Sequence, residues 1–218
     1  VDSAIDQSFN VLSTRIDRFG VVQPNIQKLS RKGRILIELP GVKEKERVRK
    51  LLQGSANLEF WETYNVTTEL LPQIAQINNE IQLQDTKLFD ILHVVENAGP
   101  VVGMAHYADT AAVMGILDSQ AAKSMLPREV RFSWTVKAVD EAEVQYQLVA
   151  LKSQPNGRPA LEGEVISDAR ADFEQTSAYA SVSMTMNPVG ASAWERITGQ
   201  NIGKSIAIVL DGYVYSYP

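Results

Sequence analysis

The chain has 218 residues, 44% of them hydrophobic and 22% charged, and a formal net charge of −5 at pH 7. This composition is typical of a globular protein, and a chain of this length buries enough surface to form a core without disulfides or metals. Acidic and basic residues are mixed along the sequence, which argues against a nucleic-acid binder, because such a protein needs a basic face. The longest apolar runs, such as residues 111–117, are far shorter than the ~20 residues that cross a bilayer.

The absence of cysteine excludes disulfides, thiolate catalysis and thiolate-bound zinc. The chain starts Val1-Asp2-Ser3, without a basic segment, an apolar run or a small-residue cleavage site. We therefore expect a mature domain or a piece excised from a larger protein.

The N-terminal part alternates helices and strands. Residues 3–19 predict an amphipathic helix, because Ile5, Phe9, Leu12 and Ile16 recur at helical spacing. The elements expected next are strands at 25–30 and 34–39 around a turn at 32–33, a helix at 43–53 and a strand at 56–64. This order matches a ferredoxin-like unit that lacks its first strand.

The central part is richer in Gln and Asn, and the Pro- and Gly-containing segment 154–159 after it is the strongest loop signal of the sequence. Its expected elements are helices at 68–82, 86–95 and 109–117, a strand at 101–107 and a hairpin of 130–139 with 144–151. The C-terminal part is expected to form a helix at 167–173, a strand at 179–187, a helix at 190–198 and strands at 204–210 and 213–217. Asp211-Gly212 between the last two is a two-residue hairpin signal.

These elements predict an α+β fold. Residues 1–65 and 159–218 are expected to form a ferredoxin-like base, and residues 66–158 an inserted α+β head. The segment 154–159 is interpreted as the return linker from head to base.

The sequence offers no convincing catalytic or metal-binding set. Residues 198–205 resemble a phosphate-binding loop, but its first glycine position holds Thr198, and a helix precedes the segment where a strand would be required. Asp168, Arg170 and Asp172 are expected within one helical turn, where the helix dipole favours Asp168 as an ordinary first-turn anion. His93 and His106 lie on different elements and lack a third nitrogen ligand. We therefore expect no enzyme, no cofactor and no metal.

Several segments resemble, in the same order, sequence blocks of the SecD family. They are Ile16-Asp17-Arg18-Phe19-Gly20-Val21 with Gln23-Pro24-Asn25-Ile26-Gln27, Glu38-Leu39-Pro40-Gly41, Ala56-Asn57-Leu58-Glu59-Phe60, Gly163-Glu164-Val165-Ile166-Ser167-Asp168-Ala169, Asn201-Ile202-Gly203-Lys204 and the run 206–218. Residues 66–158 match the family only loosely. The resemblance covers both ends of the chain.

The resemblance implies the first large periplasmic domain of SecD or of a fused SecDF, a membrane protein related to the resistance-nodulation-division (RND) transporters. Such a domain would lie on the periplasmic side of the bacterial inner membrane and capture unfolded preprotein during export driven by the proton gradient. SecF and the SecYEG channel are the partners that the resemblance implies. The alternative function is a ligand-sensing or porter domain of another RND-type transporter, which predicts an enclosed pocket with convergent polar groups instead of an open groove.

A head that holds unfolded preprotein needs an adaptable apolar surface. The candidate residues for this surface are Leu88, Phe89, Ile91, Leu92, Val95, Met104 and Met114. The alternative interpretation is that this stripe forms the core of the head. Asn65 and Gly163 flank the insert and are the candidate hinge residues.

Overall fold

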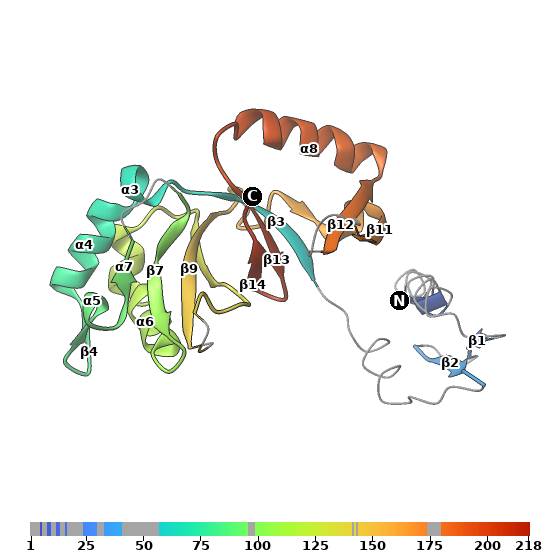
Figure 1. The fold of residues 1–218 in the computed structure, drawn as a ribbon, viewed down its shortest axis with the longest axis horizontal. Helices are drawn as coiled ribbons and strands as arrows, with labels where there is room; N and C mark the ends of the chain where they lie inside the picture. Colours follow the sequence, from blue (N-terminus) through green and yellow to red (C-terminus); the bar gives the residue numbers. More distant parts are fainter. Residues whose placement is uncertain are drawn as a thin grey trace. The chain divides into compact units, whose positions relative to one another are not determined.

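A computed structural model describes residues 5, 8–9, 12–13, 16, 24–29, 33–40, 57–95, 99–140, 142, 144–173 and 180–218, without the side chains of 171–173 and 180. The chain divides into two compact units, Val1–Ala56 and Asn57–Pro218 (Figure 1). Among the described residues, no helix has the length and apolarity needed to cross a membrane.

The first unit confirms the predicted helix and hairpin where its residues are described. Ile5, Phe9, Leu12 and Ile16 are all helical. Strands β1 (Asn25–Lys28) and β2 (Ile35–Glu38) pair antiparallel, and Gly33 between them has a φ of 87°, which glycine adopts without steric cost. The predicted helix at 43–53 lies outside the described residues.

The second unit contains one large sheet with helices on its faces. Its strands, in chain order, are β3 (Leu58–Thr63), β4 (Gln82–Leu83), β5 (Thr86–Lys87), β6 (His93–Val94), β7 (Val101–His106), β8 (Val130–Trp134), β9 (Gln145–Lys152), β10 (Leu161–Glu162), β11 (Ile166–Phe173), β12 (Ala180–Met186), β13 (Ile206–Leu210) and β14 (Tyr213–Ser216). Its helices are α3 (Val66–Glu69), α4 (Leu71–Glu80), α5 (Leu88–Ile91), α6 (Thr110–Leu117), α7 (Gln120–Met125) and α8 (Pro188–Gln200), with a 3₁₀ turn at Gly163–Val165. The large sheet has the order β14-β13-β3-β9-β7-β6, with β10 on β3 and β8 on β9.

Part of this sheet closes on itself. Strand β3 pairs with β13 and β9, β9 pairs with β8, and β13 pairs with β14. Just after β8, Thr135 forms a bridge with Val214 of β14, and the Val136 N–H donates to the Val214 carbonyl at 2.9 Å. Five strands therefore form a ring, and side chains from four of them make a cluster of their own: Trp61, Val149, Leu151, Ala207, Val209 and Val214.

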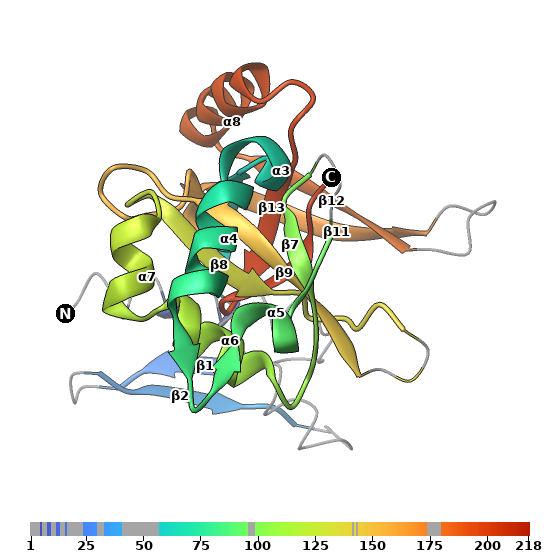
Figure 2. The ribbon, with the colours of Figure 1, turned by 90° about the vertical axis from the view of Figure 1, so that its left-hand side faces the viewer.

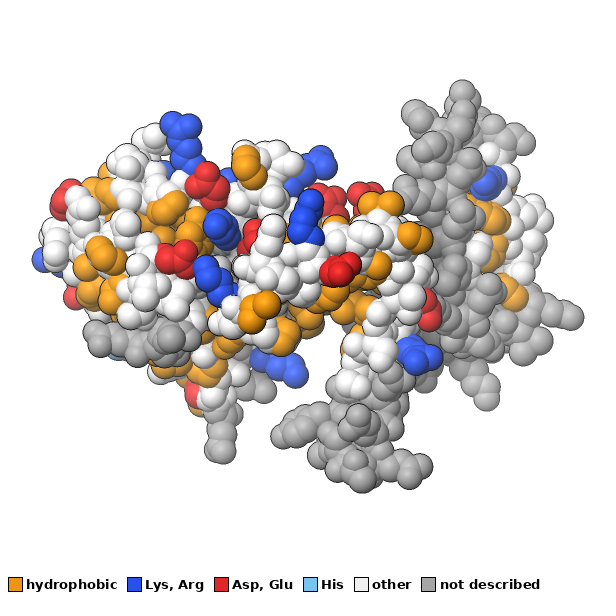
Figure 3. Space-filling view, turned by 90° about the horizontal axis from the view of Figure 1, so that it is seen from above, with side chains coloured by type: hydrophobic (Ala, Val, Ile, Leu, Met, Phe, Trp, Pro, Cys, Tyr) orange, Lys and Arg blue, Asp and Glu red, His pale blue; other side chains and the backbone are white. Residues whose placement is uncertain are grey.

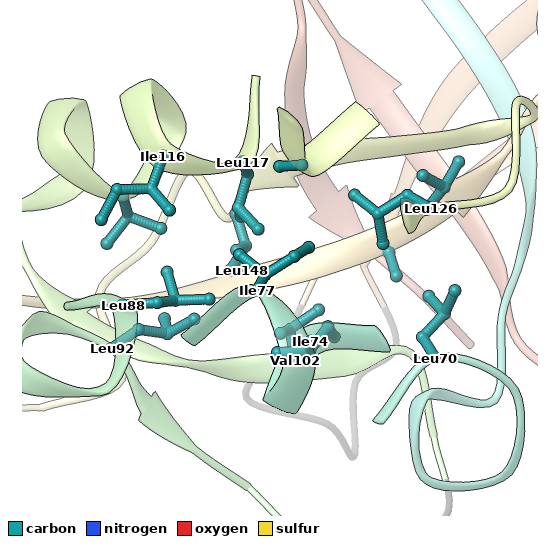
Figure 4. Close-up of a cluster of buried hydrophobic side chains, with 14 of the residues drawn as sticks. Leu70, Ile74, Ile77, Leu88, Leu92, Val102, Ile116, Leu117, Leu126 and Leu148 are labelled. Carbon is teal, nitrogen blue, oxygen red and sulfur yellow. The ribbon is translucent and has the colours of Figure 1, made fainter. Parts of the chain in front are cut away.

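The largest core lies between the sheet and helices α3–α7. Figure 2 shows α4, α5, α6 and α7 in front of β7, β8 and β9. The labelled side chains of Figure 4 point toward one another across this layer, and Ile74, Ile77, Leu148 and Val102 among them have no exposed surface. Alternate residues of β9 enter different cores, because successive side chains of a strand face opposite sides of the sheet.

A third cluster packs under α8. Phe60 has no exposed surface, and its ring meets the ring of Trp194 edge to face, with the centroids 5.3 Å apart. Helix α8 begins with Pro188 after Asn187, whose side chain accepts a hydrogen bond from the Gly190 N–H at 2.8 Å. The helix ends before the turn that contains Gly203 (φ 77°), and β13 follows. This helix-turn-strand order is the reverse of a phosphate-binding loop, as the sequence predicts.

Two predicted helices are wrong. Residues 166–173 form strand β11, which pairs with β12, so Asp168, Arg170 and Asp172 alternate along a strand instead of sharing a helical turn. Of residues 86–95 only 88–91 are helical, and His93 lies on β6. In both places pairing with a neighbouring strand overrides a local pattern that suits a helix.

The α+β class is confirmed, but the ferredoxin-like arrangement is not. In the described residues β1 and β2 form a sheet of their own, and β3 pairs with β9, β10 and β13. Strands from the predicted base and the predicted head therefore join in one sheet. The division into a base and a head stays a prediction.

A buried tyrosine is expected to make the free energy of unfolding fall at alkaline pH. Tyr64 is 7% exposed, and burial raises the pKa of its hydroxyl above the ordinary 10.0; the charges of Glu129 and Glu69 raise it further, while Arg131 lowers it. The unfolded chain releases this proton at a lower pH than the folded protein, so the stability that Tyr64 contributes is present below about pH 10 and is lost as the pH rises through the raised pKa. We expect urea unfolding to show this loss in the parent protein and a shallower loss in Tyr64→Phe. Parallel curves for both proteins, with exposed Tyr215→Phe as the control, would contradict this origin.

Candidate functional site

Aromatic side chains from four parts of the chain meet around an open groove of about 410 Å³. The groove lies in the second unit, and the residues that line it are Tyr107, Thr110, Trp134, Thr135, Val136, Tyr146 and Tyr213. Tyr107 and Tyr213 are the more exposed members, with 60% and 54% of their surface accessible. Large aromatic rings this accessible are available for contact with a partner.

The turn after β7 positions Tyr107 at one side of the groove. The Tyr107 N–H donates to the Val144 carbonyl at 2.8 Å, and the Thr110 hydroxyl donates to the Tyr107 carbonyl at 2.8 Å. The ring of His106 lies against the Tyr107 ring, with centroids 4.4 Å apart. The backbone of Tyr107 is therefore fixed while its ring remains accessible.

The Asp211-Gly212 turn positions Tyr213 at another side. Asp211 and Gly212 have φ values of 50° and 83°, as the hairpin signal predicts, and the Asp211 side chain accepts a hydrogen bond from the Asn57 N–H at 2.8 Å. Val214 is buried in the hydrophobic cluster inside the closed five-stranded part of the sheet, so its neighbours Tyr213 and Tyr215 face outward. Only Tyr213 of these two lines the groove.

Strands β8 and β9 supply the other aromatic walls. Tyr146 lies near the start of β9, and Trp134 is the last residue of β8. The indole N–H of Trp134 is buried and has no acceptor among the described residues. The Thr135 hydroxyl already donates to the Lys137 carbonyl at 2.9 Å.

The lining of the groove is uncharged where its residues are described. None of the described residues that line it carries a charge, although Asp and Glu number 26 and Lys and Arg 21 in the chain. On the face seen in Figure 3, by contrast, acidic and basic side chains are interspersed. A neutral, aromatic, open groove suits an uncharged extended ligand and offers no acid–base pair.

A second pocket, of about 510 Å³, is polar and lies between the 154–165 segment and α8. The carboxylate of Glu62 in its wall accepts hydrogen bonds from Asn201 at 2.7 Å and from Gln154 at 3.1 Å. Both oxygens of the carboxylate therefore have partners within the fold. In the part of the chain that the structure describes, no group of three potential metal ligands is close enough to hold an ion.

The residues predicted to bind preprotein lie mainly in or against the largest core. Leu88 and Leu92 have no exposed surface, Ile91 and Met114 pack against that core, and Phe89 is 37% exposed. Val95 and Met104 are half-buried. Their burial favours the interpretation of this stripe as core; a binding role for its accessible members stays a prediction.

The two predicted hinge residues take part in local packing. The Asn65 side chain accepts a hydrogen bond from the Thr68 N–H and caps α3, and its own N–H donates to Glu69 at 2.6 Å. A Cβ added at Gly163 would lie 3.0 Å from the Cβ of Leu58. A hinge role for Asn65 and Gly163 stays a prediction.

Sequence reasoning missed the aromatic groove. Its residues are 106 positions apart at the extremes, Tyr107 and Tyr213, and each of its four aromatic residues sits in a segment that was expected to be a simple strand. The one available signal was the accumulation of tyrosine near strand ends. The sequence does not show which of these aromatic rings lie together, because this depends on how the strands pair.

Two family models match the chain. One, described as the N-terminal part of the P1 domain of the protein translocase subunit SecDF, matches residues 5–65, and one described as the SecDF P1 head subdomain matches residues 137–218. The second match includes both the end of the predicted head and the C-terminal part of the predicted base.

Among curated relatives, the protein translocase subunit SecD of Rhodothermus marinus is 33% identical over an alignment that covers 100% of this chain and 39% of that protein. SecDF of Thermus thermophilus is 31% identical and is matched over 98% of this chain and 22% of its own length. The chain thus spans less than half the length of these relatives.

Solved structures agree with these matches. SecDF in a "Super-membrane-facing form" gives a TM-score of 0.52 at 26% identity, covering 100% of this chain and 22% of that one. A structure titled as a membrane component SecDF that enhances protein export gives a TM-score of 0.50 at 27% identity, covering 98% of this chain and 72% of that one.

Proposed function

Because this chain belongs to the P1-domain family of the SecD and SecDF protein translocase subunits, we propose that it holds unfolded segments of exported proteins in its aromatic groove. The domain would act on the periplasmic side of the bacterial inner membrane, as part of a longer membrane protein, with SecF and SecYEG as partners. Its role is non-catalytic and needs no cofactor. Holding a segment that has emerged prevents it from sliding back, so the proton gradient used by the parent protein yields net export.

The neutral aromatic groove is the observation that carries this proposal. An unfolded chain presents apolar side chains in many different sequences, so its holder needs accessible apolar surface without a demand for one motif. Tyr107 and Tyr213 provide such surface at the groove, where they are 60% and 54% exposed. Because tyrosine is amphipathic, its ring can contact apolar groups while the hydroxyl remains hydrated.

The alternative, a ligand-sensing or porter domain of another RND-type transporter, would use the polar pocket beside α8. That pocket is less well suited to capture a ligand, because its Glu62 carboxylate is already bonded to Asn201 and Gln154.

Titration of the protein with a labelled unfolded preprotein, beside the same preprotein in its folded form, tests the proposal. We expect weak binding of the unfolded form alone, and Tyr213→Ala should weaken it about tenfold, or about 1.4 kcal/mol, as loss of an aromatic anchor does. Tyr215→Ala is the matched control: Tyr215 lies on the same strand and is 53% exposed, but it does not line the groove. Absence of binding, or equal weakening by both substitutions, would contradict the groove's role.

A further inference from the structure

We propose that the aromatic groove is selective: it prefers extended segments that contain proline or aromatic residues over acidic segments and over aliphatic ones. This inference rests on the proposed function, because it assigns a substrate class to the same groove. It follows from the absence of charge on the described lining residues, from their aromatic rings and from the hydroxyl groups of the three lining tyrosines.

The uncharged aromatic lining selects against acidic segments. The described residues that line the groove are four aromatic residues, two threonines and one valine, none of which carries a positive charge that could pair with a carboxylate. A carboxylate placed against the negative faces of these rings would lose hydration without gaining an opposite charge. The groove therefore disfavours an acidic occupant, whereas the face seen in Figure 3 mixes both charges.

Ring geometry selects for flat or rigid side chains. Tyr107, Trp134, Tyr146 and Tyr213 converge from the turn after β7, from β8, from β9 and from β14. Grooves lined by aromatic rings bind proline-rich segments, since a segment in the polyproline II conformation is already extended and loses little entropy on binding. The backbone of Tyr107 is held by two hydrogen bonds and that of Tyr213 by a tight turn, so the backbone that carries these rings is ordered before a segment binds.

Hydroxyl groups at the groove are available for backbone carbonyls. The Tyr217 hydroxyl, outside the groove, donates to the Gln147 side chain at 2.7 Å. Among the described residues, the hydroxyls of Tyr107, Tyr146 and Tyr213 have no protein partner of this kind. A polyproline II segment exposes carbonyls that make no internal hydrogen bonds, so these donors match its backbone whatever its side chains are.

Glycans also stack on aromatic rings, but they present many hydroxyls that need bidentate partners such as carboxylates, amides or guanidinium groups. None of the described lining residues provides one. The occupant that the lining favours is therefore a polypeptide segment.

The test compares short labelled peptides of equal length, titrated against the 218-residue chain in a fluorescence anisotropy experiment. One peptide is neutral and contains proline and tyrosine, the second has leucine at those positions, and the third keeps proline and tyrosine but has glutamate in place of the neutral residues between them. We expect the first to bind about tenfold more tightly than the others, as a well-placed aromatic contact allows. Tyr213→Phe should keep the preference for rings and prolines, whereas Tyr213→Ala should remove most of it and Tyr215→Ala should leave it unchanged.

The outcomes separate this inference from the proposed function. Equal affinity for all three peptides, with binding of an unfolded preprotein still weakened by Tyr213→Ala, overturns the selectivity and leaves the holding function intact. Failure of every peptide and of the unfolded preprotein to bind overturns both. Displacement of the first peptide by a neutral oligosaccharide at similar concentration overturns the assignment to polypeptides.

Discussion

Replacing Leu92 by alanine is expected to lower the free energy of unfolding by about 2–5 kcal/mol, the range for a leucine removed from a well-packed core. Leu92 has no exposed surface and lies among Leu88, Val102 and Ile116 in the close-up of Figure 4. Removing its side-chain atoms loses their burial and leaves a cavity that the surrounding helices and sheet only partly fill. Chemical denaturation with a two-state fit measures the change.

Phe89→Ala is the matched control for this substitution. Phe89 lies on α5, three residues from Leu92, but 37% of it is exposed, so its loss should cost about 1 kcal/mol or less. If both substitutions cost the same, Leu92 does not occupy the core. The pair also separates the two sequence-based interpretations of this stripe, because a side chain that serves binding can be removed without unfolding the protein.

Replacing Gly190 by alanine is expected to cost about 1–3 kcal/mol, the usual penalty for adding an atom to a filled site. The added Cβ would lie 2.6 Å from the Cβ of Val165 and 3.3 Å from its carbonyl oxygen. That carbonyl accepts a hydrogen bond from the Asn187 N–H at 2.8 Å, so the segment cannot withdraw without breaking this bond. Helix α8 would have to lift from the cluster that contains Phe60 and Trp194.

Gly199→Ala is the control on the same helix. Apart from its chain neighbours and the nearby backbone of its own helix, a Cβ at Gly199 would meet no atom of the described residues within 4 Å, so the substitution should gain up to about 1 kcal/mol from the higher helix propensity of alanine. Thermal unfolding should then show a lower Tm for Gly190→Ala and a higher Tm for Gly199→Ala than for the parent protein. Stabilisation by both substitutions would show that α8 does not press on Val165.

The residues proposed to hold polypeptide in the structure differ from those that the sequence predicts. The apolar stripe of residues 88–95 was readable from its spacing, but spacing alone cannot distinguish a face that contacts a partner from one that contacts the protein's own sheet. Leu88 and Leu92 meet the sheet. The exposed aromatic residues were less conspicuous, because Tyr107 and Tyr213 each stand at the boundary of a strand.

Features that depend on neighbouring residues were determined by the sequence itself. The turn at Asp211-Gly212, the helix that starts at Asn187-Pro188 and the hairpin around Gly33 all follow from residues within a few positions of one another. Membership of the family is also a property of the sequence, since it depends on ordered blocks at both ends of the chain.

Only the tertiary structure decided which strands pair and therefore where side chains meet. The bridge between Thr135 and Val214 closes the five-stranded ring, and the pairing of β11 with β12 turns a predicted helix into a strand. Strand pairing depends on hydrogen bonds and packing between segments that are distant in sequence. Because the backbone groups that form these hydrogen bonds are the same in nearly every residue, the sequence by itself does not show which strands will pair. The aromatic groove results from that pairing, because its four aromatic side chains come together only when β8, β9 and β14 join the closed five-stranded part of the sheet.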